Sequence, residues 1–105
     1  MKDKNYILQL IKESVSNTEP NAILILYGSY ARGDFRVDSD LDLLVLLDKE
    51  IITRFDQKRI KYPLYDIEFD TGTIISPLIF SKKDWEKRHR NTPFFENVAR
   101  EGKVL

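Results

Sequence analysis

The chain of 105 residues is 42% hydrophobic and 32% charged, and we expect it to form a single globular domain over residues 1–105. Its 17 basic and 17 acidic residues cancel, so we expect no direct nucleic-acid binding and no attraction to an anionic membrane. The sequence has no cysteine, which excludes disulfides and thiolate metal sites, and no apolar run of signal-peptide type or membrane-spanning length. The cytoplasm is therefore the expected location.

The first half of the chain predicts one helix followed by two buried strands. Apolar residues recur at helical spacing within residues 4–16, and Pro20 ends this segment. Residues 22–27 and 40–48 are short apolar runs bounded by polar turn sequences, as in strands that lie inside a core.

The sequence of residues 50–70 is compatible with either a helix or a strand. Their apolar residues have helical spacing, namely Ile60, Leu64 and Ile67, and Gly72 stands where a helix C′ residue would lie. Pro63 interrupts the segment, so the pattern favours a helix that is kinked or begins near Pro63, over a strand.

The last third of the chain predicts a strand and two helices. Residues 73–80 have strand character, and Pro77 places this strand at a sheet edge or a bulge. A helix is expected to begin near Ser81, and another at Pro93 that ends at Gly102. The order αββαβαα indicates an α/β (α+β) domain with a small mixed sheet and flanking helices.

Residues 26–48, LYGSYARGDFRVDSDLDLLVLLD, combine glycines with carboxylates. Gly28 and Gly33 have the spacing of a P-loop, but Asp34 and Phe35 stand where that motif needs lysine and serine or threonine. The sequence also contains no G-x-G-x-x-G motif. A P-loop is therefore rejected, and a dinucleotide-binding fold has no support.

The same stretch predicts a site for a metal-bound phosphate. Gly28 lets a ligand approach the backbone closely, and Ser29 with the N–H groups of the following turn can hold an anion. Asp40 and Asp42 are two residues apart on a strand, so both point to one face and can converge on a hard divalent cation. This combination suits Mg²⁺ carrying a nucleoside triphosphate.

The motifs GSYARG and DSDLDLLV resemble the G-S-x-A-R-G … S-D-x-D-L-x-V signature of the nucleotidyltransferase superfamily related to DNA polymerase β, in its minimal (MNT-type) form. The resemblance implies that Gly28 and Ser29 contact the triphosphate, and that the catalytic residues Asp40 and Asp42 bind Mg²⁺ or Mn²⁺. It places Arg32 near the phosphates or as a brace of the loop.

The resemblance also implies transfer of a nucleoside monophosphate from a nucleoside triphosphate, with ATP expected, to a hydroxyl. Small relatives commonly act with a helical partner of the HEPN class in toxin–antitoxin pairs, so the acceptor is expected on such a partner. A non-catalytic module that binds nucleotide or neutralises a partner is the alternative.

The superfamily uses a third carboxylate on the strand after the long helix, where this sequence has Ser76. Asp66 and Glu68 lie nearby in sequence. In a strand either could reach the metal site, whereas in a helix they would lie about 200° apart around the axis. Asp66 is the better candidate for a third catalytic carboxylate, although the helical pattern favours a site completed by Asp40 and Asp42 alone.

Overall fold

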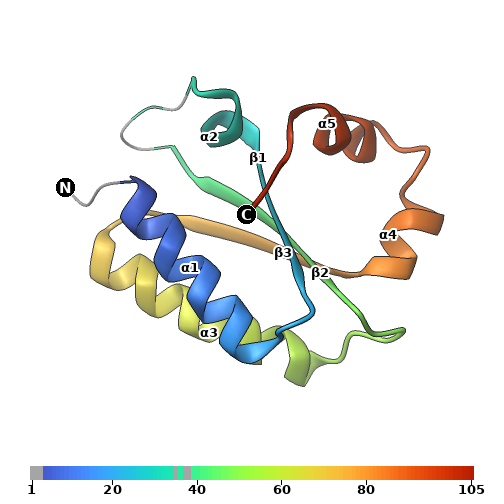
Figure 1. Ribbon diagram of the computed structural model, residues 1–105, viewed down its shortest axis with the longest axis horizontal. Helices are drawn as coiled ribbons and strands as arrows, with labels where there is room; N and C mark the ends of the chain where they lie inside the picture. Colours follow the sequence, from blue (N-terminus) through green and yellow to red (C-terminus); the bar gives the residue numbers. More distant parts are fainter. Residues whose placement is uncertain (1–3, 35, 37–38) are drawn as a thin grey trace.

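A computed structural model describes residues 4–34, 36 and 39–105 (Figure 1). Within these residues the chain forms a four-stranded sheet with helices on both of its faces. The elements are, in chain order, α1 (Lys4–Thr18), β1 (Ile23–Tyr27), α2 (Gly28–Arg32), β2 (Leu41–Leu47), α3 (Arg54–Thr71), β3 (Ile75–Ser81), α4 (Lys82–Arg88), α5 (Pro93–Glu101) and β4 (Lys103–Val104).

The sheet is mixed, with the strand order β3-β2-β1-β4. Strand β1 pairs antiparallel with β2 and with β4, whereas β2 and β3 are parallel and are joined by the crossover helix α3. In this register Asp42 of β2 lies between Tyr27 of β1 and Ser76 of β3. Three strands therefore meet at the position of the second predicted carboxylate.

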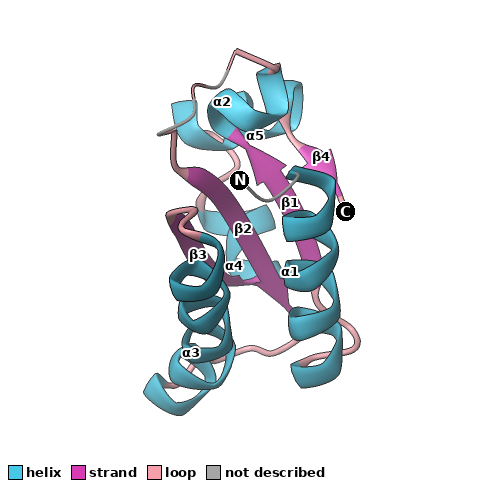
Figure 2. Cartoon of the chain, turned by 90° about the vertical axis from the view of Figure 1, so that its left-hand side faces the viewer, coloured by secondary structure: helices cyan, strands magenta, loops and turns pink. Residues whose placement is uncertain are grey.

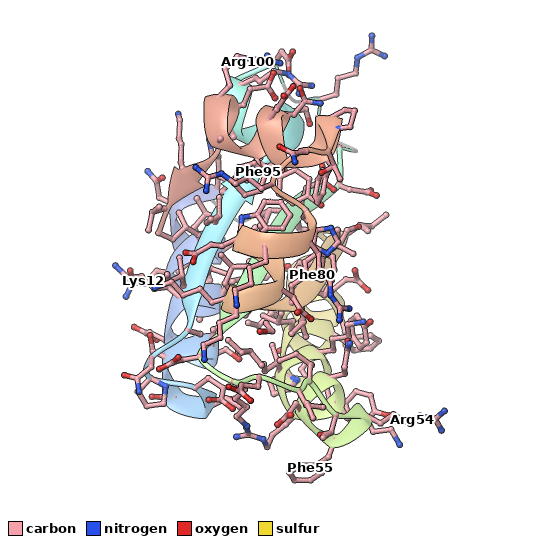
Figure 3. The ribbon with its side chains drawn as sticks, turned by 90° about the vertical axis from the view of Figure 1, so that its right-hand side faces the viewer. Lys12, Arg54, Phe55, Phe80, Phe95 and Arg100 are labelled. Carbon is pink, nitrogen blue, oxygen red and sulfur yellow. The ribbon has the colours of Figure 1, made fainter. Side chains whose placement is uncertain are left out.

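The two faces of the sheet bury separate hydrophobic clusters. Helices α1 and α3 lie side by side on one face (Figure 2), where they pack on alternate β2 residues such as Leu41, Leu43 and Val45. The intervening residues Leu44 and Leu46 face α4 and α5 and pack with Trp85 and Val98, in a cluster that also includes Phe80 and Phe95 (Figure 3). Asp42 has the same parity as Leu44, so it belongs to the α4 and α5 face.

Residues 54–71 form a helix, as the apolar spacing predicted, but the helix begins earlier than Pro63. Thr53 and Asp56 form a capping box at its start, because the Thr53 hydroxyl accepts from the Asp56 N–H and the Asp56 carboxylate accepts from the Thr53 N–H. Pro63 lies inside the helix, and Gly72 ends it in the left-handed region at φ 75°.

The other predicted elements are confirmed to within two residues at each boundary. Strand β3, which contains Pro77, is at an edge of the sheet. The side chains of Ser81 and Thr92 cap α4 and α5, and α5 ends at Gly102 as expected. Strand β4 was not predicted, since its two residues form no pattern that a sequence can show. Among the described residues, no helix has both the length and the apolar character needed to cross a bilayer.

Candidate active site

Gly28 forms the junction between β1 and α2, and its conformation is one that glycine favours. Its φ is 75°, in the left-handed region, so the chain turns from strand into helix within one residue. A Cβ at this position would overlap Asp42 Oδ2 and lie 3.2 Å from Asp42 Cγ. The absent side chain therefore leaves the space that the Asp42 carboxylate occupies against the backbone of residue 28.

Asp40 and Asp42 lie together at the N-terminal end of β2, and Asp42 is on the face of the sheet that carries α4 and α5. Asp42 is half-buried on the strand, and Asp40 is exposed immediately before it. The Ser76 hydroxyl of β3 donates a hydrogen bond of 3.4 Å to Asp40 Oδ2. Ser76 thus stands beside both carboxylates, at the position where the sequence lacks an acid.

Burial, and secondly the charge of Asp40, raise the pKa of the Asp42 carboxyl, while Arg32 acts in the opposite direction. Among the described residues, neither Asp40 nor Asp42 forms an ion pair with a lysine or arginine. Two neighbouring carboxylates without a cationic partner favour a bound cation, which would neutralise their repulsion.

The pair fits a divalent ion that shares its coordination with a substrate. In the described part of the chain, no three His, Cys, Asp or Glu side chains gather as a complete metal site. Mg²⁺ is usually held by one or two protein carboxylates, with phosphate oxygens and water as its other ligands. Asp40 and Asp42 match that arrangement.

Arg32 braces the α2 turn. Its guanidinium bonds Asp34 at 3.2 Å and Glu101 of α5 at 3.2 Å, which ties α2 to the end of α5. Asp34 first, and Glu101 next, raise the pKa of Arg32. Of the two roles expected for Arg32, the bracing role is the one these contacts describe, and its charge still acts on Asp42.

Ser29 lies at the start of α2, directly beside Gly28, and is partly buried. Its carbonyl oxygen accepts hydrogen bonds from the N–H groups of Gly33 at 3.0 Å and Asp34 at 3.2 Å. These bonds close the turn that follows Gly28. Gly28, Ser29, Arg32, Asp40 and Asp42 are therefore brought to one end of the sheet.

Tyr27 is a member of this region that the sequence did not single out. It is the cross-strand neighbour of Asp42, and its ring packs edge-on against Phe94 with centroids 5.3 Å apart. Burial, followed by the charge of Asp42, raises the pKa of Tyr27 to about 12, so its phenol stays neutral at physiological pH. The two-residue alternation of Ile23, Ile25 and Tyr27 along β1 could have predicted that Tyr27 lies on the same face of the sheet as Asp42.

Asp66 and Glu68 are not brought to this site. Both lie on α3, which covers the opposite face of the sheet. Asp66 is exposed, and Glu68 Oε1 accepts a hydrogen bond of 2.7 Å from the Ile75 N–H. Because residues 54–71 form a helix, Asp66 lies away from Asp40 and Asp42. This is the outcome expected if the segment were helical.

The sequence of this chain matches one protein-family model and two named relatives. The family model described as nucleotidyltransferase domain matches residues 8–96. Two proteins of Methanocaldococcus jannaschii, each named "Putative protein adenylyltransferase", are 34% and 37% identical to this chain. The first alignment covers 78% of this chain and 75% of the relative, and the second covers 72% and 81%.

Solved structures of low sequence identity share the fold. A toxin–antitoxin structure with AMP-PNP has a TM-score of 0.65 at 16% identity, and the match covers 91% of this chain and 69% of that chain. A protein from Sulfolobus solfataricus described as a "putative nucleotidyltransferase" has a TM-score of 0.54 at 18% identity, and the match covers 98% of this chain and 87% of that chain. The family model spans most of the chain, the close relatives agree with it, and the chain accordingly belongs to the nucleotidyltransferase domain family.

Proposed function

We propose that this nucleotidyltransferase binds a nucleoside triphosphate, ATP being the expected one, through Mg²⁺ or Mn²⁺ held by Asp40 and Asp42, and transfers a nucleoside monophosphate to a hydroxyl group of a protein. The observation that carries the proposal is the pair Asp40 and Asp42, which forms no ion pair with a lysine or arginine in the described part of the chain, with Asp42 packed against the backbone of Gly28. A divalent cation that carries phosphate needs negative protein ligands, and two neighbouring carboxylates supply them.

Each residue of the site has a defined task in this proposal. Asp40 and Asp42 supply anionic oxygens, and the missing side chain of Gly28 leaves room for the Asp42 carboxylate at the start of α2. Arg32 holds α2 in place through Asp34 and Glu101 while adding positive charge near Asp42. A bound divalent cation would supply charge neutralisation of the triphosphate and of the leaving pyrophosphate.

A protein hydroxyl is the proposed acceptor because the two relatives from Methanocaldococcus jannaschii are named as protein adenylyltransferases. A nucleotide with an adenine base is favoured by the AMP-PNP in the toxin–antitoxin structure of similar fold. We extend the proposal to the setting of a toxin–antitoxin pair, in which a helical HEPN-type partner carries the acceptor, a tyrosine hydroxyl.

Ser76 favours one alternative function. Its hydroxyl lies 3.4 Å from Asp40 Oδ2, in place of a carboxylate that could accept the proton of the acceptor hydroxyl. A site with two carboxylates can bind metal and nucleotide without turnover. In that case the chain acts as a nucleotide-binding module that neutralises its partner by occupying it.

Mass spectrometry separates the two functions. The proposed partner, sought as the product of the gene next to the one for this chain, is incubated with this protein, ATP and Mg²⁺ or Mn²⁺. A matched sample lacks the metal. We expect a mass increase of one or more nucleoside monophosphates that requires the metal. An unmodified partner that still forms a complex with this chain would support the binding module and contradict the transferase.

A further inference from the structure

Strand β3 has an exposed apolar side chain beside the carboxylate pair. Its even-numbered residues lie on one face, since Ser76 donates a hydrogen bond to Asp40 and Phe80 belongs to the cluster under α4 and α5. Leu78 lies between these two residues of the strand and is 40% exposed. We call Ser76 and Leu78 the β3 face, because they form the part of β3 that lies next to the carboxylates on this side of the sheet.

The helices that cover this side of the sheet stop short of Leu78. Phe80 stacks on Trp85 of α4 with ring centroids 5.8 Å apart, so α4 shields the last part of β3. Leu44, the β2 residue paired with Leu78, is fully buried in the same cluster. The exposed surface of Leu78 therefore adjoins the polar groups of the candidate active site. Ligand sites in proteins typically combine apolar surface with a few polar groups in this way.

The free edge of β3 is closed to an added strand at its first residues. The Ile74 carbonyl accepts from the Leu41 N–H at 2.8 Å and so points towards β2. The backbone groups of Ile75 and Pro77, the alternate residues, therefore point to the free edge. Glu68 Oε1 already accepts from the Ile75 N–H at 2.7 Å, and Pro77 has no N–H. A partner segment that met these two residues would find neither donor free, so we expect contact through side chains on the face of the strand.

The positive charge at the site lies on one side of the carboxylates, and β3 lies on the other. Arg32, whose charge acts on Asp42, comes from α2 and is tied to Glu101 of α5 at 3.2 Å. Helix α2 follows β1, and β1 and β3 are on opposite sides of β2 (Figure 2). Strand β3, with the sequence ISPLIFS, has no charged residue. The anionic pyrophosphate is therefore favoured on the α2 side rather than on the β3 side.

The direction of attack follows from this separation. In an in-line displacement the attacking and leaving oxygens lie on opposite sides of the phosphorus. With the pyrophosphate on the α2 side of Asp42, the attacking hydroxyl approaches from the β3 side. The β3 face therefore meets the acceptor rather than the leaving group.

We propose that the β3 face holds the ring of the acceptor tyrosine, with Leu78 as the specificity-determining residue that contacts the ring. This inference rests on the proposed nucleotide transfer. In that reaction the phenol oxygen bonds to the α-phosphorus, its proton passes to water, and pyrophosphate leaves with the electron pair of the bond that breaks.

The shape of a tyrosine side chain fits the β3 face. A phenol has an apolar ring and a polar oxygen at its end. Residues two apart on a strand are separated by about 6.6 Å, which is close to the length of this side chain. A hydroxyl beside the carboxylates and Ser76 therefore places the ring on Leu78.

NMR of the methyl groups of the full chain tests this contact without requiring turnover. The sample contains Mg²⁺ and an ATP analogue with a methylene group between its α and β phosphorus atoms, which cannot release pyrophosphate. The probe is N-acetyl-tyrosinamide, and N-acetyl-serinamide is the matched hydroxyl without a ring. We expect only the tyrosine probe to give ring-current shifts at Leu78. Ile51, which is 76% exposed beyond the other end of β2, should not respond.

Two outcomes of the NMR titration would overturn the proposal. One is the absence of a shift at Leu78 up to the solubility limit of the tyrosine probe, or an equal shift at Ile51. The other is a ring-current shift at Leu78 from the ATP analogue alone with none from the tyrosine probe, since the nucleobase would then occupy the β3 face.

Transfer kinetics with the proposed partner give a second test. Leu78→Ser should raise the KM for the acceptor protein about fivefold or more, with kcat and ATP affinity within about twofold of the parent. Leu78→Met keeps the apolar contact and should restore the KM, and Ile51→Ser should match the parent. Circular dichroism confirms that each variant is folded.

The kinetic test separates this proposal from the proposed function. An unchanged KM in folded Leu78→Ser would overturn the acceptor contact while leaving nucleotide transfer intact. A parent chain that transfers nothing would contradict the proposed function, and the NMR titration would still decide whether a tyrosine ring binds at Leu78.

Discussion

The backbone of Gly28 lies against the carboxylate of Asp42, so closely that a Cβ on residue 28 would overlap Asp42 Oδ2. Gly28 lies at the junction of β1 and α2, and Asp42 lies on β2. This contact therefore joins the glycine-containing half of the sequence motif to its aspartate-containing half. The glycine and the aspartate are therefore one structural unit. A side chain on the first residue would displace the second.

Gly28→Ala should remove metal-dependent nucleotide binding, because the new methyl group must push the Asp42 carboxylate aside. Gly33→Ala is the matched control, since Gly33 also has a positive φ, of 82°, but a Cβ there meets nothing within 4 Å. Both variants should lose about 1 kcal/mol or more of folding stability from backbone strain. Calorimetric titration with ATP and Mg²⁺ should find binding lost only in Gly28→Ala. Equal ATP affinities in the two variants would show that Gly28 is not part of the nucleotide-binding site.

Ser76→Asp should lower the concentration of Mg²⁺ or Mn²⁺ needed for nucleotide binding, since it places a third carboxylate beside Asp40. Ser76→Ala removes only a hydrogen bond of 3.4 Å to an exposed carboxylate, so its metal requirement should stay within about twofold of the parent. Metal titrations at a fixed ATP concentration measure the metal concentration that each variant needs for nucleotide binding. An unchanged requirement in folded Ser76→Asp would place residue 76 outside the metal site.

Asp66→Asn and Glu68→Gln should each leave nucleotide transfer within a few-fold of the parent, because α3 holds both residues on the far face of the sheet. Glu68→Ala should lower the free energy of unfolding by about 1–2 kcal/mol, since the Ile75 N–H loses its acceptor. Rate measurements and urea unfolding check these values. A loss of about 100-fold in the rate of Asp66→Asn, with binding retained, would make Asp66 a catalytic base.

Asp56→Asn should destabilise the chain in a pH-dependent way. Lys49 first, and then the Thr53 N–H, hold the pKa of the buried Asp56 carboxyl well below its usual range. A lowered folded-state pKa stabilises the fold above the unfolded pKa of about 3.9, and this contribution is lost as the pH falls below it.

The Asn variant should therefore unfold with about 1–3 kcal/mol less free energy at pH 7 than the parent, and the difference should narrow below about pH 4. Urea unfolding across this range gives the comparison. Asp48→Asn, at an exposed carboxylate beyond the end of β2, should follow the parent throughout. A difference for Asp56→Asn that stays constant with pH would contradict the ion-pair account.

The strands and the site motif could be predicted because their signals are local. The apolar runs around β1 and β2 and the two-residue spacing of Asp40 and Asp42 depend only on neighbouring residues. The helical character of α3 was also visible in the spacing of Ile60 and Leu64, despite Pro63.

Contacts between distant segments could not be predicted in the same way. The overlap of a residue 28 Cβ with Asp42, and the ion pair of Arg32 with Glu101, depend on the register of the sheet and on where α5 packs. The start of α3 at Arg54 rather than near Pro63 follows from the capping box of Thr53 and Asp56, which the sequence contained but the proline obscured.

Binding of ATP in the presence and absence of Mg²⁺, measured by calorimetry on the parent, the double variant Asp40→Asn with Asp42→Asn, and Asp48→Asn, tests the central claim most directly. Amides cannot neutralise the cation that joins the protein to phosphate, so the double variant should lose metal-dependent binding. The parent and Asp48→Asn should bind ATP alike, and only with the metal. Equal ATP affinity in the folded double variant and the parent would contradict the assignment of Asp40 and Asp42 as the metal–nucleotide site.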